Sequence, residues 1–328
     1  MTPARPLVLI VSPALAAANN GNWQTAWRWS RLLAGPVRVR IVPHWQPGDH
    51  PQAQAMLALH ARRSAPAIAA WAQAHPGRGL AVVLTGTDLY RDIHTDAAAQ
   101  RSLALAQQLV VLQDQGLHDV PAPYRAKSRV IYPSTSVRVP VARSGRRLRV
   151  VMVGHLREEK MPQTLWEAAR LLRGRTDIRI DHIGAALDPA LGEAARATMA
   201  QCPQYRWLGP LPHEATRRRI QRAHVLAHTS RMEGGAHVLM EAVCSGTPVL
   251  ASRIPGNVGM LGADYGGYFP LGDAAALAQG ILSCRQGQNR PDGMLAALQA
   301  QCASRVPLFA PAAEQAALRG LLQDLLAP

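Results

Sequence analysis

The sequence lacks the features that mark membrane, disulfide-rich or nucleic-acid-binding proteins. No apolar run approaches the roughly eighteen residues of a membrane-spanning helix. The four cysteines are widely spaced and form no C-x-x-C pair, so neither a metal site nor a disulfide scaffold is indicated. Aromatic residues make up only 5% of the chain, and no nucleic-acid recognition motif occurs. We therefore expect a reduced, cytoplasmic protein with no membrane partner and no nucleic-acid partner.

Several catalytic motifs are also absent. The sequence contains no G-x-x-x-x-G-K-[ST], no H-E-x-x-H and no G-x-S-x-G, which disfavours an ATPase, a zinc protease and a serine hydrolase. It has no D-x-D pair of the kind that chelates a metal in many sugar transferases. These absences favour chemistry that needs neither a metal ion nor a cofactor.

The charge of the chain is strongly positive. There are 36 Lys and Arg residues against 21 Asp and Glu residues, a formal net charge of +15 over 328 residues. Such an excess favours an anionic partner. Because the arginines are scattered rather than arranged in a stripe, a small polyphosphate substrate fits at least as well as nucleic acid. A high arginine usage without any binding role is the alternative.

Strand-like and helix-like segments alternate along the chain, which predicts parallel sheets with helices on both faces. In the first half we expect strands over residues 7–12, 37–42, 56–59, 80–84, 109–112 and 130–132 and helices over 22–33, 64–74 and 96–108. In the second half we expect strands over residues 148–153, 178–183, 205–208, 224–228, 248–251 and 267–269.

This pattern predicts an α/β protein with two Rossmann-like, doubly wound domains that face a central cleft. A basic linker without apolar periodicity separates the two sets of strands. We place the first domain at residues 1–142 and the second at 143–309. Residues 310–328 form a last helix, which we expect to pack back on the first domain.

Two glutamates, Glu233 and Glu241, flank a glycine-rich stretch that follows an expected strand. On a helix that rises about 1.5 Å per residue, the two carboxylates would lie roughly 12 Å apart, about the length of a nucleotide sugar. The backbone N–H groups of Gly234, Gly235 and Ala236 would face a diphosphate at the open start of the helix. A solvated pair of surface glutamates is the alternative. The position after the carboxyl end of a strand favours the ligand site.

The loop after the first strand of the second half carries a cluster of cations. Gly154 lets the backbone turn, and His155, Arg157 and Lys160 are predicted to converge near the edge of the sheet. Cations in this position can hold a diphosphate leaving group while a glycosidic bond breaks. We expect the main role for Lys160. A solvated turn of mixed charge is the alternative.

A compact anion site is predicted in the first half, where an expected strand runs into a helix. His60, Arg62 and Arg63 stand beside the helix start. Ser64 suits the N-cap and Pro66 the first turn. A capped helix with incidental surface arginines is the alternative. We predict that the residues from His60 to Ser64 bind an acceptor.

Two further loops of the first half are candidates for acceptor binding. Thr87 and Asp88 follow an expected strand and are predicted to position an acceptor or a proton-transfer group, with a hydrogen-bonded turn as the alternative. Asn20, Gly21 and Asn22 open the first helix. In the second half, three glycines at three-residue spacing in residues 253–262 predict a loop that approaches the ligand.

These motifs resemble those of the GT-B glycosyltransferases, specifically glycosyltransferase family 4. In that family an E-x7-E motif binds the donor sugar through its first Glu and the ribose through its second, and a G-R-x(4)-K segment grips the diphosphate without a metal. Glu233 and Glu241 match the first motif, and Lys160 matches the lysine of the second. His155 stands where the family usually has arginine. Residues 131–137 also depart from the usual Pro-Asn-Gly-Val.

Within this group the sequence is similar to the selenosugar synthases of selenoneine biosynthesis. The similarity is carried by residues 59–64, 84–92, 232–238 and 256–262, and it extends to about residue 278. It implies an enzyme of selenium metabolism that joins selenophosphate to the anomeric carbon of UDP-N-acetylglucosamine or UDP-glucose and releases UDP. The donor is expected in the second domain and selenophosphate against the first.

Three other functions stay open at this stage. The first is an ordinary family 4 transferase that uses a UDP-sugar and a hydroxyl or thiol acceptor. The second is a UDP-sugar epimerase on the same fold, and the third is a nucleic-acid-binding protein, which the net charge permits. The sequence leaves undecided the preferred hexose, retention or inversion at the anomeric carbon, the step at which phosphate leaves selenium, and the number of subunits.

Overall fold

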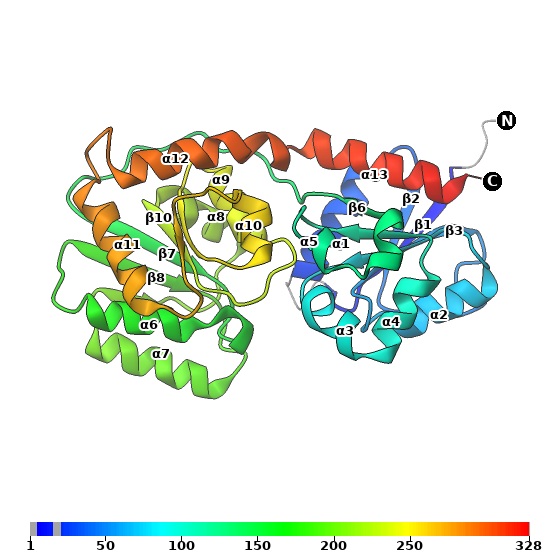
Figure 1. Ribbon diagram of the computed structural model, residues 1–328, viewed down its shortest axis with the longest axis horizontal. Coiled ribbons are helices and arrows are strands. Elements are labelled where there is room, and N and C mark those ends of the chain that lie inside the picture. The colour runs from blue at the N-terminus through cyan, green and yellow to red at the C-terminus, as the bar shows by residue number, and fades with distance from the viewer. Residues whose placement is uncertain (1–4, 16–20, 328) are drawn as a thin grey trace. The chain divides into compact units, whose positions relative to one another are not determined.

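The computed structural model describes residues 5–15 and 21–327, which form two compact units (Figure 1). The first unit consists of Met1–Ser134, Glu233–Ala236 and Leu308–Pro328, and the second of Thr135–Met232 and His237–Pro307. The first division falls after Ser134, not after residue 142, because the following segment is bonded to the second unit. The Arg138 amide donates to the Cys244 carbonyl at 2.8 Å, and the Gln221 side chain donates to the Val139 carbonyl at 2.7 Å.

In the first unit, the described residues contain one parallel sheet of six strands, in the order β2-β1-β3-β4-β5-β6. The strands are β1 (Leu7–Val11), β2 (Arg38–Val42), β3 (Ala53–Leu59), β4 (Leu80–Leu84), β5 (Gln108–Val111) and β6 (Ser128–Val130). The helical segments are α1 (Gly21–Leu32), α2 (Ala65–Ala74), η2 (Asp88–Asp92), α3 (Ile93–Thr95), α4 (Ala97–Leu105), α5 (Gly116–Asp119), η3 (Ala122–Lys127) and α13 (Pro311–Leu326).

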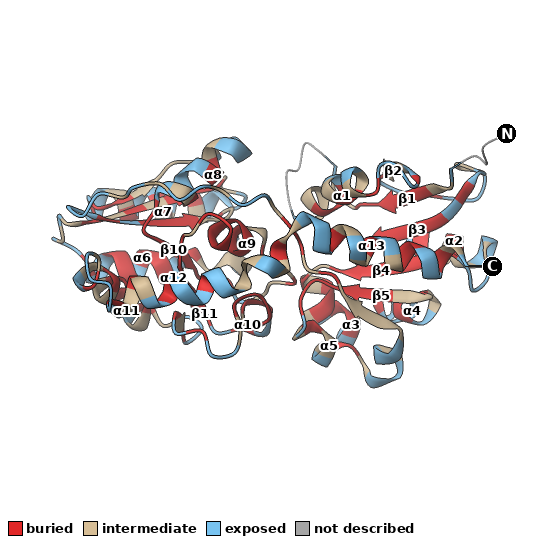
Figure 2. Cartoon of the chain, turned by 90° about the horizontal axis from the view of Figure 1, so that it is seen from above, coloured by how far each residue is buried: buried red, intermediate tan, exposed pale blue. Residues whose placement is uncertain are grey.

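Both faces of the first sheet are covered, because successive side chains of a strand point to opposite sides. On one face Leu9 of β1 packs in a core cluster with Trp71 of α2. On the other face Val8 of β1 packs with Trp29 of α1 and Leu321 of α13. Figure 2 shows the resulting concentration of buried residues on the strands. This double coverage explains why the inner strands β1 and β4 are apolar throughout, whereas the edge strand β2 alternates between arginine and apolar residues.

A buried carboxylate fixes α13 to the rest of the first unit. The Glu314 side chain is fully buried. It accepts hydrogen bonds from Arg28 Nε at 2.8 Å, Trp29 Nε1 at 2.7 Å and the Ser134 amide at 2.9 Å. The last helix of the chain is therefore joined both to α1 and to the residue that ends the first unit's main segment.

The second unit, over its described residues, also contains one parallel sheet of six strands, in the order β12-β11-β10-β7-β8-β9. The strands are β7 (Leu148–Val153), β8 (Ile178–Ile183), β9 (Tyr205–Trp207), β10 (Val225–His228), β11 (Val249–Ser252) and β12 (Tyr268–Phe269). The helical segments are η4 (Glu158–Lys160), α6 (Pro162–Leu171), α7 (Pro189–Gln201), α8 (His213–Arg222), α9 (His237–Val243), α10 (Pro255–Leu261), α11 (Ala274–Gln286), α12 (Met294–Arg305) and η5 (Val306–Phe309), which runs on into the first unit.

The predicted strands are present with shifted ends, and two predictions about loops are wrong. Residues 88–95, which the sequence placed in a loop after β4, form a π-helix and a short α-helix, η2 and α3. Most of the stretch 253–262 forms helix α10 (Pro255–Leu261), which places Gly256 and Gly259 inside a helix. Pro255 suits the first turn of α10, and the Asn257 amide group donates to the Ser252 carbonyl at 2.9 Å, which ties the new helix to the end of β11.

No helix in the described part of the chain is long and apolar enough to cross a membrane. Nor does the same part contain a group of three or more His, Cys, Asp or Glu side chains that would hold a metal ion. Cys202, Cys244, Cys284 and Cys302 are all described, and each is buried as a free thiol. Burial raises the pKa of Cys244 to about 11, so its reactive thiolate form is disfavoured.

Candidate functional site

The strand order of the second unit selects one edge of its sheet as a ligand site. β7 lies at the centre, β8 and β9 extend to one side of it, and β10 to β12 extend to the other. In open α/β sheets, ligands bind outside the carboxyl ends of the strands at the point where the order reverses. Here that point lies between β7 and β10. The loops that leave these two strands are the ones that carry the predicted cations and the E-x7-E stretch.

The two loops at this point are bonded to each other. Thr229, just after β10, donates its hydroxyl hydrogen to the Lys160 carbonyl at 2.7 Å. The Arg231 amide donates to the Glu159 carbonyl at 3.0 Å. Met161 then adopts the left-handed conformation with φ 44°, and α6 begins at Pro162. The backbone that carries Lys160 is thus fixed from both sides.

Two glycines let the neighbouring loops approach closely. A Cβ atom on Gly184, where φ is +155°, would lie 1.9 Å from the Gly154 carbonyl oxygen. A Cβ atom on Gly154 would lie 3.4 Å from Cγ and Cδ of Lys160, so the lysine side chain runs across this glycine. This arrangement brings together Gly154 and Lys160, as the sequence predicts.

His155 does not supply the cation that the sequence predicts. Its Nδ1 accepts a hydrogen bond from the Ala185 amide at 3.0 Å. Burial, with smaller contributions from the charges of Arg157 and Lys160, lowers the pKa of His155, so the ring is neutral near pH 7. The Arg157 side chain is about half exposed and lies 3.9 Å from the Glu159 carboxylate. The cationic character of this loop therefore rests on Arg157 and Lys160.

Glu241 lies within α9, where its carboxylate is almost completely buried. His213, the first residue of α8, lies with Nε2 2.6 Å from Glu241 Oε1. Arg217, one turn further along α8, is 4% exposed and donates to the Ser136 carbonyl at 3.0 Å. Sequence reasoning missed His213. The only available signal was the spacing of His213 and Arg217, which places both on one side of a helix.

The other half of the E-x7-E stretch is not helical. Helix α9 begins at His237, so Glu233 and Gly234–Ala236 lie in the preceding loop, and the helical rise cannot be applied between Glu233 and Glu241. Residues 233–236 are part of the first unit. Within it, a Cβ atom on Gly234 would lie 2.4 Å from the Thr85 carbonyl oxygen, and one on Gly235 would lie 2.6 Å from Leu112 Cβ. Close packing therefore requires both glycines, independently of any ligand.

The first unit has its own reversal of strand order. β1 lies between β2 and β3, so the loops that leave β1 and β3 flank the reversal point. Gly21 and Asn22 begin α1 after the first of these loops, and Asn20 lies outside the described residues. The residues from His60 to Ser64 form the second loop. The topology thus places these two groups of predicted acceptor-binding residues on strands that are neighbours in the sheet.

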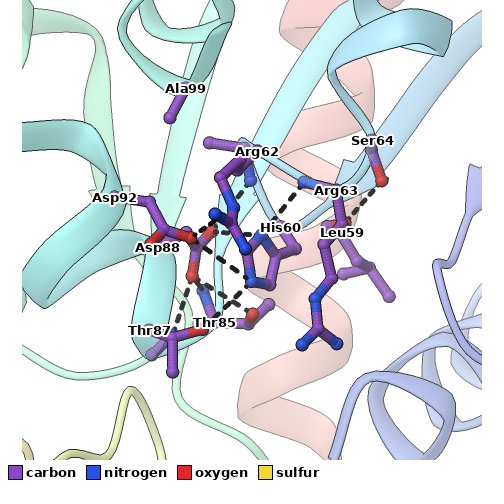
Figure 3. A network of polar contacts seen from close by, with 12 residues as sticks. Leu59, His60, Arg62, Arg63, Ser64, Thr85, Thr87, Asp88, Asp92 and Ala99 are labelled. Carbon is purple, nitrogen blue, oxygen red and sulfur yellow. Dashed lines mark hydrogen bonds and ion pairs between the residues drawn. The ribbon is translucent and has the colours of Figure 1, made fainter. Parts of the chain in front are cut away.

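Asp88 joins the loops after β3 and β4 and is completely buried. Its Oδ1 accepts hydrogen bonds from the amides of Thr85 and Gly86 at 2.9 and 3.0 Å, and its Oδ2 accepts from the Ala61 amide at 2.9 Å (Figure 3). Both oxygens are used by the backbone. This geometry does not support the predicted direct contact with an acceptor, and it favours a role in holding the two loops in register.

His60 is buried and adopts a left-handed conformation, with φ 74°. Its Nδ1 accepts from the Arg63 amide at 3.3 Å, and its Nε2 lies 3.0 Å from Thr87 Oγ1 (Figure 3). Burial lowers the pKa of His60 more than the nearby carboxylates raise it, so the ring is neutral near pH 7. A neutral ring that accepts at Nδ1 carries its proton on Nε2. The Thr87 oxygen accepts a hydrogen bond from this N–H group, which leaves its own hydroxyl hydrogen to donate elsewhere.

The two arginines of this loop differ in their partners. Arg62 Nε lies 3.2 Å from Asp92 Oδ2, a buried carboxylate that sequence reasoning did not single out. Arg63 is exposed and forms no ion pair with any acidic residue that the structure describes. Ser64 is the N-cap residue of α2, as predicted, but its hydroxyl donates to the Leu59 carbonyl at 2.6 Å and caps no amide. Of these two arginines, Arg62 thus has an acidic partner, which it shares with Arg91, and Arg63 has none among the described residues.

With this geometry, the two parallel sheets define an α/β protein of the GT-B class, as predicted. Residues 133–295 match the sequence model of the family Glycosyl transferases group 1. This part of the chain, just under half of it, is therefore similar in sequence to group 1 glycosyltransferases. A search of curated proteins gives no match.

Solved structures with similar folds include three proteins of low sequence identity. S. aureus TarM, determined with fondaparinux, α-GlcNAc-glycerol and UDP, has a TM-score of 0.65 at 12% identity, covering 81% of this chain and 55% of its own. Sucrose-phosphate synthase from Thermosynechococcus elongatus has a TM-score of 0.75 at 17% identity, covering 98% and 99%. Anabaena Alr3699/HepE, in complex with UDP and glucose, has a TM-score of 0.71 at 15% identity, covering 98% and 100%. The chain thus spans about half the length of TarM.

Proposed function

We propose that this protein is a UDP-sugar-dependent glycosyltransferase that uses selenophosphate as its acceptor and forms a selenosugar. The observation that carries the proposal is the joining of the loops after β7 and β10 at the reversal point of the second sheet. One of these loops carries Lys160 and the other leads into the E-x7-E stretch. The resemblance to selenosugar synthases supplies the acceptor and the donor, UDP-N-acetylglucosamine or UDP-glucose.

On the donor side, each group has a distinct task. Glu241 accepts hydrogen bonds from the ribose hydroxyls and Glu233 from the hexose hydroxyls. The backbone N–H groups near Gly154 and in residues 234–236 donate to the diphosphate. Lys160, assisted by Arg157, stabilises the negative charge that grows on the diphosphate as UDP departs. No metal ion enters this scheme.

On the acceptor side, the residues suit a small anion. Arg63 offers a charge without an acidic partner, and Thr87 offers a hydroxyl hydrogen that is oriented by His60. Gly21 and Asn22 begin α1, which follows β1, the neighbour of β3 in the sheet. A small phosphate-like anion such as selenophosphate is held by such donors without a long apolar groove.

The reaction needs little acid–base assistance. A selenium lone pair attacks the anomeric carbon, a carbon–selenium bond forms, and the bond from that carbon to the diphosphate oxygen breaks. The electron pair of the broken bond leaves with UDP. Because selenium is already a strong nucleophile, the enzyme contributes mainly by holding two anions close together and by stabilising departing UDP.

The decisive experiment is mass analysis of the products formed from selenophosphate and UDP-N-acetylglucosamine, with UDP release measured in parallel. We expect UDP to appear only when selenophosphate is supplied, together with a product that contains both selenium and the hexose. Release of UDP with hexose or thiol acceptors and none with selenophosphate would contradict the proposal. An epimerised sugar formed without any acceptor would contradict it as well.

An ordinary sugar transferase with a hydroxyl or thiol acceptor is the second candidate. It is favoured by the similar fold of sucrose-phosphate synthase over nearly the whole chain. At 17% identity this similarity concerns the fold, so the acceptor must be decided by the product analysis above.

The difference between the two arginines leads to a prediction about acceptor binding. Arg63→Gln should raise the KM for selenophosphate by about 10-fold or more, since a hydrogen bond to a charged group is worth about 1.5–3 kcal/mol. Arg62→Gln is the matched comparison and should have a smaller effect, because Arg62 already pairs with Asp92. Steady-state kinetics with varied selenophosphate would measure the two KM values. The affinity for UDP should be unchanged in both variants. An equal effect of both substitutions would remove the distinction drawn here.

A further inference from the structure

Glu241 has a partner that the E-x7-E pattern does not include. His213 Nε2 lies 2.6 Å from Glu241 Oε1, and Oε2 accepts no hydrogen bond from the residues that the structure describes. Glu241 has a side chain that is 9% exposed, whereas His213 is 53% exposed. A carboxylate removed from water in this way depends on the few donors that reach it. His213 is the one direct donor to Glu241 among the described residues, so it can determine how the Glu241 carboxylate is oriented.

The same helix supplies a second positive charge. Arg217 follows His213 by four residues on α8, so both face α9 from one side of the helix. The Arg217 guanidinium is held by the Ser136 carbonyl, and the charge of Glu241 acts on it without a direct hydrogen bond. Arg217 thus acts on Glu241 only through its positive charge, whereas His213 forms a direct hydrogen bond with the Glu241 carboxylate.

We propose that His213 is a positioning residue of the donor site, whose imidazole N–H holds Oε1 of Glu241 and thereby presents Oε2 to the ribose hydroxyls of the nucleotide. This inference rests on the proposed function, because it assigns a second residue to the same ribose contact. His213 itself needs no contact with the nucleotide. Its effect passes through the conformation of the Glu241 side chain, which has three rotatable bonds.

The pair should also give the donor site a pH dependence. The groups that face His213 are Glu241 on α9 and Arg217 and Glu214 on its own helix, with Arg138 and Cys244 beside Arg217. The hydrogen bond to Glu241 raises the pKa of His213. Below this raised pKa the imidazolium and the carboxylate form an ion pair. As the pH rises through it, the ring loses its charge and holds the carboxylate less firmly.

The test is calorimetric binding of UDP-N-acetylglucosamine between about pH 6 and pH 8.5, where the diphosphate diester does not titrate. His213→Ala should weaken binding about 10-fold at neutral pH. His213→Gln, which keeps an N–H donor, should bind within about 3-fold of the wild type and lose the pH dependence. Arg218→Ala, an exposed position on the same helix, serves as the control and should bind like the wild type.

A double-substitution cycle separates positioning from a general structural effect. If His213 acts through Glu241, the variant with both His213→Ala and Glu241→Gln should bind no more weakly than Glu241→Gln alone. Additive losses, unchanged binding by His213→Ala, or tighter binding by it would overturn the proposal. Tighter binding would mean that the ring competes with the ribose for Glu241.

The two levels of the proposal fail in different ways. Absence of nucleotide-sugar binding by the wild type overturns the proposed function and, with it, the ribose role of Glu241. Binding by the wild type that is unaffected by His213→Ala overturns only the present inference. An NMR titration of His213 without ligand checks the pair itself, since Glu241→Gln should remove the upward shift of the His213 pKa.

Discussion

Glu314→Ala is expected to lower the free energy of unfolding of the first unit by about 3–5 kcal/mol, the cost of removing one partner from a buried ion pair. The substitution removes the acceptor shared by the Arg28 guanidinium and by the buried Trp29 indole N–H and Ser134 amide. Each unsatisfied buried donor opposes folding. Urea unfolding followed by far-UV circular dichroism, with hydrogen exchange of the α13 amides, would measure the loss.

Asp324→Asn provides the matched control for this prediction. Asp324 lies on the same helix and pairs with Arg129, but its side chain is 53% exposed. Exposed ion pairs contribute about 0–1 kcal/mol, so this variant should unfold close to the wild type. If the two variants lost similar stability, burial would not be the reason for the importance of Glu314.

The second large effect is expected on activity, from the two glutamates of the E-x7-E stretch. Glu233→Gln should lower kcat/KM for the UDP-sugar by about 100-fold while leaving the affinity for UDP nearly unchanged. Glu241→Gln should weaken the binding of UDP itself. Charge-assisted hydrogen bonds of about 1.5–3 kcal/mol each, made to two hydroxyls, account for an effect of this size.

Steady-state kinetics together with UDP calorimetry separates these outcomes. Glu193→Gln, on α7 of the second unit, is a suitable control because no proposed ligand contact involves that helix. Equal losses of UDP affinity in Glu233→Gln and Glu241→Gln would contradict the orientation of the donor assigned here. The prediction does not depend on the identity of the acceptor.

Much of the architecture could be predicted because its causes are local. Apolar runs such as those of β4 and β7, each followed by a turn and a helix, fix strands and helices within a few residues of one another. The two predictions that were wrong concern loops after strands. Helix α10 was missed because glycines usually interrupt helices, whereas Asn257 and Pro255 stabilise its start here.

The candidate site could be predicted only in part, because side-chain partners are often distant in sequence. Lys160 and Gly154 are near neighbours in the chain, and the structure keeps them together. The partner of His155 is the amide of Ala185, thirty residues away, and nothing near His155 reveals it. In the same way, no residue near Glu241 in the sequence indicates that His213, on a different helix, is its partner.

The sequence by itself determined the two parallel α/β halves, the E-x7-E spacing and the cation-bearing loop, because each follows from residues within one or two turns of chain. The tertiary structure alone decided which strands adjoin, and therefore which loops meet at each reversal point. It also decided that residues 233–236 belong to the first unit and that Arg62 pairs with Asp92 while Arg63 has no acidic partner among the described residues. Strand order and ion pairing depend on contacts between segments far apart in the chain, which local patterns do not specify.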